Sequence, residues 1–374
     1  MYLKQLAALL ARAPQAATAL TAVVAVFNAR QLQLSAPPNL LTSGLNNLNV
    51  LLTLEPMSKC AGQGACDNSS EHCAASQWVL RCNTPQPLAL RQQEVQAWQA
   101  AASAQLAPPL LWHSEDYQLF ISEYCPSSCA DIFGQGFAAP AKFTSASDWL
   151  SAMAHQGSTI SSLKLERAPP SPKITFTEPL APHLAALLTM LLQLSRLPLP
   201  QRHMSTGAQI EGYLQALMQR APSARWPVAE QQRWYQAQTQ VMQYWQVNSK
   251  RLAVVDKVLT WSQFSHRDLH PDNLLWRQGQ VYCLDFEFCC AGHPLWDLTS
   301  IVATCQLPPR QASTFCGRYL QAHPHLTLAH IELMPAMLDS YWFTACCWAL
   351  NQARDTQSLD CLDWFDSFWQ VVTK

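Results

Sequence analysis

The sequence is poor in charged residues and in glycine. Of its 374 residues only 13% are charged, and 24 basic against 25 acidic residues give a formal net charge of -1. This balance excludes a protein that binds nucleic acid through an overall basic field, and it excludes an acidic disordered chain. With only 11 Gly, and with 25 Pro spread along the chain, a collagen-like repeat is excluded as well. We therefore expect a globular protein with no nucleic acid partner.

Long hydrophobic runs are missing too. The longest, from Ala16 to Phe27, has about 12 residues, whereas a helix needs roughly 20 to cross a bilayer. Lys4 and Arg12 precede this run, as basic residues precede the apolar part of a signal peptide. The surrounding Ala and Leu residues favour a buried opening helix instead, so we expect no membrane partner.

Cysteine is present but dilute. The 14 Cys are scattered or directly adjacent, as in Cys289-Cys290 and Cys346-Cys347, and adjacent cysteines rarely bridge. We interpret them as small buried side chains of a protein from the reducing cytoplasm. One group lacks the paired Cys-x2-Cys spacing that favours a zinc site: Cys60, Cys66, His72, Cys73 and Cys82.

The first third of the chain is rich in predicted strands, and the remainder is mostly helical. Helices are predicted at 2–28 and 88–105, strands within 31–54 and at 78–81 and 119–124, and an exposed polar loop at 55–76. From residue 143 onward the apolar spacing is mainly that of helices. This order predicts an α+β fold.

One stretch combines a hairpin with three oxygen-bearing side chains. Two short apolar strands, 273–276 and 281–285, flank Arg277-Gln278-Gly279-Gln280, which predicts a β-hairpin with Gly in its turn. The hairpin brings Asn273 close to Asp285, and Asp268 lies on the loop just before it. A Mg²⁺-nucleotide needs one or two carboxylates beside its phosphates, and a further carboxylate can orient the attacking hydroxyl.

The same stretch matches the phosphotransferase signature His-Arg-Asp, four residues, Asn, and then Asp-Phe. Its members are His266-Arg267-Asp268, Asn273 and Asp285-Phe286-Glu287. The form Asp-Leu-His-Pro-Asp-Asn resembles the aminoglycoside phosphotransferase and choline kinase superfamily, and most of all its bacterial choline, ethanolamine and thiamine kinases. The segment 292–298, Gly-His-Pro-Leu-Trp-Asp-Leu, follows too soon to leave room for an activation loop, so a protein substrate is not expected. His293 in it is expected to be a hydrogen-bonding loop residue.

The resemblance implies a two-lobed protein-kinase-like fold. Residues 1–125 would form a small antiparallel-sheet lobe that binds the nucleotide, and residues 126–374 a larger helical lobe for catalysis and substrate binding. It also implies ATP and Mg²⁺, a small hydroxyl compound as acceptor, and no particular oligomeric state. The implied roles are hydroxyl orientation by Asp268, bracing of the loop by His266 and Arg267, and metal binding by Asn273 and Asp285 with help from Glu287.

Further residues fall at the family's nucleotide-binding positions. Arg81 would be the phosphate-binding cation, where most members of the superfamily carry Lys, and Glu94 on the following helix would be its partner. The remaining positions are Ser43, Gly44, Asn46 and Asn47 in the phosphate loop, and Glu123 and Cys125 at the hinge that meets the adenine.

The C-terminal part is rich in aromatic residues interleaved with carboxylates, a combination that suits an ammonium group. Trp342, Trp348 and Trp364 are the candidate walls of a substrate site, although core packing is the alternative for most of these aromatics. Ala345 stands where choline kinases often carry Trp, which argues against choline itself, while thiamine, ethanolamine, an amino sugar or another amino alcohol stays open. Two other readings stay open: an aminoglycoside-type phosphotransferase, and an inactive kinase-fold protein that binds a metabolite. The interleaved carboxylates are Asp339, Asp355, Asp360, Asp363 and Asp366.

Overall fold

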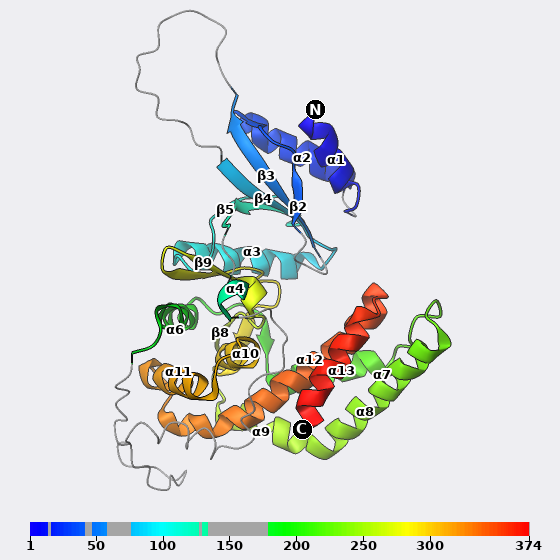
Figure 1. The fold of residues 1–374 in the computed structure, drawn as a ribbon, viewed down its shortest axis with the longest axis vertical. Coiled ribbons are helices and arrows are strands. Elements are labelled where there is room, and N and C mark those ends of the chain that lie inside the picture. Colours follow the sequence, from blue (N-terminus) through cyan, green and yellow to red (C-terminus); the bar gives the residue numbers. More distant parts are fainter. Residues whose placement is uncertain (14–15, 42–46, 58–75, 127–128, 134–178, 374) are drawn as a thin grey trace, which may run out of the picture. The chain divides into compact units, whose positions relative to one another are not determined.

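The chain folds as two compact units, Met1–Ser127 and Ser128–Lys374 (Figure 1). The structure is a computed structural model, and it describes residues 1–13, 16–41, 47–57, 76–126, 129–133 and 179–373. The first unit is an antiparallel sheet with helices, and the described part of the second is mostly helical. The predicted α+β class is confirmed.

The sheet of the first unit has six strands in the order β1-β3-β4-β6-β5, with β2 also pairing with β3. Every neighbouring pair in it is antiparallel. The short strand β5 was not predicted. The elements are α1 (Tyr2–Leu10), α2 (Ala16–Ala29), β1 (Leu32–Leu34), β2 (Asn39–Leu41), β3 (Leu48–Pro56), β4 (Ser76–Cys82), α3 (Leu88–Ser103), β5 (Leu110–His113) and β6 (Leu119–Glu123).

The two faces of this sheet carry different side chains, because neighbours along a strand point in opposite directions. Leu80 and its like-facing neighbours form a buried cluster with α1 and α2, so the predicted opening helix is a helix pair packed on the sheet. Arg81 and Phe120 are register partners on the other face, where Trp98 of α3 meets the Phe120 ring edge-on at 6.1 Å. The alternation therefore turns Arg81 toward α3. In the described part of the chain, no helix is both long enough and apolar enough to cross a membrane.

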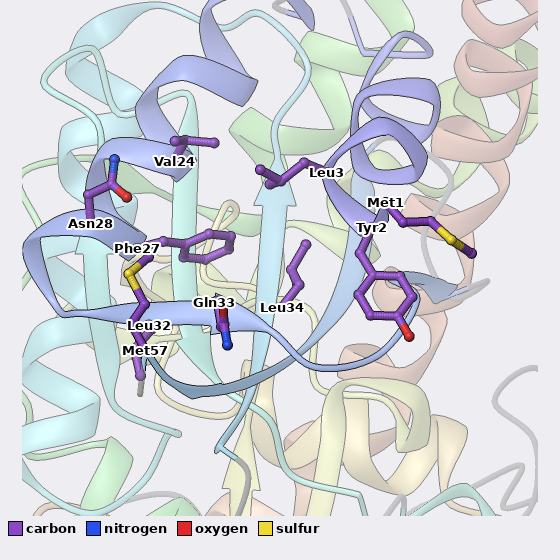
Figure 2. A pocket seen from close by; sticks show the side chains of 10 residues that line it. All are labelled: Met1, Tyr2, Leu3, Val24, Phe27, Asn28, Leu32, Gln33, Leu34 and Met57. Carbon is purple, nitrogen blue, oxygen red and sulfur yellow. The ribbon is translucent and has the colours of Figure 1, made fainter. Parts of the chain in front are cut away.

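A small pocket of about 200 Å³ lies where α1, α2 and β1 meet (Figure 2). Phe27, Leu32 and Leu34 contribute apolar walls, and Asn28 and Gln33 contribute amide groups. None of its lining residues is among the predicted site residues, so this pocket is separate from the predicted chemistry.

The second unit contains the predicted hairpin, formed by β9 (Leu274–Arg277) and β10 (Gln280–Cys283). Gln278 and Gly279 both have positive φ, 53° and 81°, as the central residues of a type I′ turn require. The second unit also contains a three-stranded sheet, β7-β11-β8, and helices. The other elements are α4 (Ala130–Phe133), α6 (Pro182–Leu194), β7 (His203–Met204), α7 (Thr206–Met218), α8 (Val228–Leu252), α9 (Val254–Val258), β8 (Gln263–Ser265), η1 (Pro271–Asn273), β11 (Cys290–Gly292), α10 (Trp296–Thr304), α11 (Pro309–Ala322), η2 (Leu328–Leu333), α12 (Met334–Thr356) and α13 (Asp360–Thr373).

Gly292 on β11 allows the close approach of β8, which leads into the signature stretch. A Cβ atom at this position would lie 2.9 Å from the Cβ of Ser265 and 3.2 Å from the Sγ of Cys290. We expect Gly292→Ala to lower the free energy of unfolding by about 1–3 kcal/mol, since overpacking forces neighbouring backbone to move. Thermal unfolding followed by circular dichroism would measure this loss.

Gly212→Ala is the matched control. Gly212 lies inside α7 and a Cβ there would meet nothing within 4 Å, so Ala should stabilise the helix by about 0.5–1 kcal/mol. Equal melting temperatures for the two variants would contradict the steric role of Gly292.

Candidate active site

The signature loop is held by the buried carboxylate of Asp297, at the start of α10. Oδ1 accepts hydrogen bonds from Ser265 Oγ at 2.9 Å and from the Arg267 amide at 3.0 Å, and Oδ2 accepts from the His266 amide at 2.9 Å. Asp297 is only 3% exposed. Hydrogen bonds to a buried carboxylate are among the stronger ones in proteins. The start of the loop is therefore pinned to α10.

His266 connects the loop to the hairpin. Its Nε2 lies 2.8 Å from the carbonyl oxygen of Leu284, and its ring packs against Phe286 at 4.9 Å. The Leu284 amide in turn donates to the carbonyl of Asn273 at 2.9 Å. These contacts bring the backbone before Asp285 next to Asn273, as the hairpin predicted.

Asp268 carries a partly exposed carboxylate on this loop. Asn273 Nδ2 donates to its Oδ2 at 2.9 Å and to its backbone carbonyl at 3.0 Å. Burial raises the pKa of Asp268, but His270, His266 and Asn273 together bring it below its usual value. The carboxylate is thus ionised at neutral pH and able to accept a hydrogen bond from a hydroxyl.

His270 is an ionic partner that the sequence reasoning missed. Its Nε2 lies 3.7 Å from Asp268 Oδ2, and its Nδ1 lies 3.5 Å from Asp272 Oδ2. Burial lowers the pKa of His270, but the two carboxylates outweigh burial and raise it to about 10. The ring is therefore an imidazolium beside Asp268 at neutral pH.

Asn273 and Asp285 offer an amide oxygen and a carboxylate, which are donor types suited to Mg²⁺. Within the described residues, no three His, Cys, Asp or Glu side chains are grouped to hold a metal by themselves. An amide and a carboxylate nevertheless fit Mg²⁺, which takes few protein ligands and completes its shell with phosphate oxygens and water. Asp285 has a φ of 64°, an uncommon conformation for a residue other than Gly. Glu287 follows two residues later and is half-buried.

Arg267 is fixed against α10 by its neighbours. Its φ is 73°, its carbonyl accepts from Trp296 Nε1 at 3.3 Å, and its guanidinium lies 3.7 Å from the centre of the Trp296 ring. The expected bracing by Arg267 is compatible with these contacts.

The first unit contains a buried charge cluster. Arg81 Nη2 lies 3.5 Å from Glu94 Oε1, which makes the predicted partners an ion pair. Arg91, a residue that sequence reasoning missed, pairs with Glu94 at 2.5 Å and donates to the carbonyl of Thr84 at 2.8 Å. The Thr84 amide donates to Asn47 Oδ1 at 3.1 Å.

The other predicted nucleotide residues have simpler surroundings. Glu123 ends β6, and Cys125 is buried just beyond it. Ser43, Gly44 and Asn46 lie outside the described residues, and so do Cys60, Cys66, His72 and Cys73 of the cysteine group. Cys82 is buried in the sheet, and burial raises the pKa of its thiol to about 12.

The three predicted substrate tryptophans are not equivalent. Trp342 is 3% exposed and packs against Tyr341 and Phe368 with ring centres 5.4 and 5.5 Å away, so its surroundings are those of a core residue. Trp348 of α12 and Trp364 of α13 are half-buried and stack on each other at 5.9 Å. These two helices lie side by side (Figure 1).

Four of the five nearby carboxylates are already bound by arginines. Arg220 pairs with Asp355 at 2.7 Å, and Arg251 pairs with Asp339. Arg233 binds Asp363 at 2.7 Å and Asp366 at 2.5 Å. Each of these four carboxylates therefore already has a guanidinium partner within the protein.

Comparison with known proteins agrees with this geometry. The profile of the phosphotransferase enzyme family matches residues 70–328, more than half of the chain. The chain belongs to this family. The resemblance read from the signature stretch is therefore confirmed, and the protein is a phosphotransferase.

Solved structures of similar fold are kinases. Choline kinase LicA from Streptococcus pneumoniae is 12% identical with a TM-score of 0.55, covering 94% of this chain and 96% of that one. A choline/ethanolamine kinase family protein from Mesorhizobium loti is 14% identical with a TM-score of 0.51, covering 100% and 94%. LicA has also been solved in complex with AMP. At this identity the likeness shows the fold.

A curated relative is similar over a short stretch. The N-acetylmuramate/N-acetylglucosamine kinase of Caulobacter vibrioides is 39% identical over 70 residues, 17% of this chain and 19% of the relative. The match thus spans about a fifth of the relative's length.

Asp297 and Arg91, like His270, were not predicted as functional residues from the sequence. Each acts through a tertiary contact of a buried charge. A charged residue inside an otherwise apolar helix segment was the available signal, as at Asp297 between Trp296 and Leu298.

His293 gives the second unit a pH-dependent stability. The ring is 4% exposed, its Nδ1 accepts from the Leu295 amide at 3.2 Å, and its Nε2 lies 3.3 Å from the carbonyl of Val255. It is the hydrogen-bonding loop residue that was expected. Burial lowers the pKa of His293 to about 4, whereas the unfolded chain keeps an ordinary value near 6.5.

Between those pH values the unfolded chain binds more protons, so this contribution to stability is present above pH ~6.5 and is lost as the pH falls toward ~4. We expect a loss of about 3 kcal/mol across this window, measured by urea denaturation. His293→Gln should reduce the slope of stability against pH. Identical slopes in both proteins would show that His293 does not titrate on unfolding.

Proposed function

We propose that this phosphotransferase moves the γ-phosphoryl group of ATP to a hydroxyl of a small molecule, with Mg²⁺ bound. The observation that carries the proposal is the ionised Asp268, fixed by Asn273 on a loop whose hairpin also brings Asp285 close. Membership of the phosphotransferase enzyme family supports it, and so does a structural relative solved with AMP.

The residues divide the work as follows. Asp268 accepts a hydrogen bond from the acceptor hydroxyl and takes up its proton as the new bond forms. Asn273 and Asp285 would hold Mg²⁺, with Glu287 helping through water, and a metal bound there would supply neutralisation of charge on the phosphate oxygens. His266 and Asp297 keep the loop in place.

In the first unit we assign phosphate binding to Arg81, oriented by Glu94. Arg91 holds Glu94 from the other side, so the carboxylate is fixed between two guanidinium groups. Ser43, Gly44, Asn46 and Asn47 remain the proposed phosphate loop, and Glu123 and Cys125 the proposed adenine contacts.

The acceptor is proposed to be a small hydroxyl compound. Stacked Trp348 and Trp364 are compatible with a choline-, ethanolamine- or thiamine-type acceptor, but the arginine-bound carboxylates beside them remove much of the electrostatic support for a cation. An amino sugar, as in aminoglycoside-type phosphorylation, is the other acceptor class. A role as an inactive metabolite-binding protein is disfavoured, because Asp268, Asn273 and Asp285 are all present.

We place the reaction in the cytoplasm. The described cysteines are buried and unbridged, which suits a reducing compartment where ATP is available.

Removal of the proposed proton acceptor is the direct test. Asp268→Asn keeps the shape of the side chain and its contact with Asn273 but cannot take up a proton, so phosphoryl transfer should fall about 10²–10⁴-fold. Transfer is measured as ADP release in the presence of a panel of choline, ethanolamine, thiamine and amino sugars. Glu211→Gln, an exposed carboxylate on α7, is the control and should keep full activity. An Asp268→Asn protein as active as the wild type would refute the assignment.

The metal role of Asp285 can be tested separately. Chelation should abolish transfer, and added Mg²⁺ should restore it. Because Asp285→Asn replaces an anionic ligand with a neutral one, we expect the Mg²⁺ concentration for half-maximal activity to rise about tenfold or more. An unchanged Mg²⁺ dependence would mean that Asp285 is not a ligand.

A further inference from the structure

Arg267 has hydrogen-bonding capacity that the described structure does not use. The side chain is 6% exposed, directly before Asp268 in the chain. Nη2 donates to Gln209 Oε1 on α7, and one face of the guanidinium lies on the Trp296 ring. Nε and Nη1 are buried and have no acceptor among the described residues. Such unpaired donors are rare in folded proteins and costly for a cation.

The nearest carboxylate does not meet these donors. Asp297 offsets the charge of Arg267, but its two oxygens already accept from Ser265 and from the amides of His266 and Arg267. Among the described residues, the guanidinium of Arg267 makes no hydrogen bond or ion pair with Asp297. The two buried N–H groups therefore need an oxygen from elsewhere.

Cys290 and Tyr213 also lie within electrostatic range of Arg267, and Arg202 adds a second positive charge. Burial lowers the pKa of Arg267, and the positive charge of Arg202 lowers it further, so a second guanidinium lies close. The charges of Arg267, Arg202 and Asp268 all affect the pKa of Tyr213 on α7, which burial raises. The α7 side of Asp268 thus has two arginines within electrostatic range, and an anion is the complement to that environment.

We infer that Arg267 is a specificity-determining residue that binds a carboxylate on the acceptor whose hydroxyl Asp268 orients. The inference rests on the proposed function and narrows its acceptor to hydroxy compounds bearing an anionic group. Guanidinium suits this task because it stays charged when buried and presents several donors in a fixed plane. A quaternary or primary ammonium would instead meet like charge.

Paired acceptors that differ by one carboxylate provide the test. N-acetylmuramate is N-acetylglucosamine with an added lactyl ether, and glycerate is the acid counterpart of glycerol. We expect the wild type to favour the carboxylated member of at least one pair by tenfold or more in kcat/KM, and to favour it over choline and ethanolamine. Arg267→Gln should reduce that ratio at least tenfold. A purely structural brace would lower activity on both members of a pair and leave the ratio unchanged.

Two further variants keep the test decisive. Gln209→Glu leaves Arg267 in place but supplies a carboxylate to its guanidinium, so it should also reduce the ratio. This variant replaces Arg267→Gln in the test if Arg267→Gln does not fold. Arg220→Gln removes an arginine whose partner is Asp355 on α12, and it should leave the ratio unchanged.

The outcomes separate this inference from the proposed function. The inference would be overturned if the wild type preferred a neutral or cationic acceptor. It would also be overturned if the ratio were unchanged in folded Arg267→Gln or Gln209→Glu. In either case, measurable phosphoryl transfer would still support the proposed kinase activity. If no hydroxyl compound is phosphorylated, the proposed function fails, and the inference about Arg267 is then tested by ligand binding alone. Thermal stabilisation by N-acetylmuramate or glycerate that is lost in Arg267→Gln would support it, and absence of stabilisation in the wild type would overturn it.

Discussion

The carboxylate of Asp297 organises the reactive end of the second unit. It lies in the first turn of α10, where the helix dipole favours a negative charge, and it accepts hydrogen bonds from Ser265, His266 and Arg267. From there the contacts run through His266 to Leu284 and through Leu284 to Asn273. This one buried side chain therefore sets the position of the loop that carries Asp268 and of the hairpin that Asn273 and Asp285 flank.

This anchoring also explains how uncommon backbone conformations persist. Arg267 and Asp285 both have positive φ, which costs energy for residues with a side chain. Each follows directly on an anchored position, the amide of His266 or the carbonyl of Leu284. The surrounding hydrogen bonds hold the backbone in this conformation. As a result, the side chains of Arg267 and Asp285 point in a different direction from the one that a regular strand would give them.

The hairpin and signature residues could be predicted from sequence because local rules govern them: alternating apolar residues, a Gly at a positive-φ turn position, and fixed spacing along one loop. The bonds to Asp297 could not, because they join residues about 30 positions apart through tertiary packing. For a related reason, the sequence could not decide which aromatic residues of α12 and α13 pack in the core and which could line a substrate site. Trp342 and Trp348 both lie on α12, yet Trp342 is buried against Phe368 whereas Trp348 is half-buried and stacks on Trp364.

Charge is used locally in this nearly neutral chain. On α8, α12 and α13, charged side chains form exposed arginine–carboxylate pairs, each of which contributes little to the stability of the fold. Beside Asp268, by contrast, the buried guanidinium of Arg267 has two N–H donors, at Nε and Nη1, without an acceptor among the described residues. A phosphotransferase acting on an anion must bring two negative groups together, the triphosphate and the acceptor. A fixed cation on the acceptor side offsets that repulsion without reorganising during the reaction, which is the arrangement that electrostatic catalysis favours. The position of Arg267, next in the chain to Asp268, is where such a cation would act on the acceptor rather than on the phosphates.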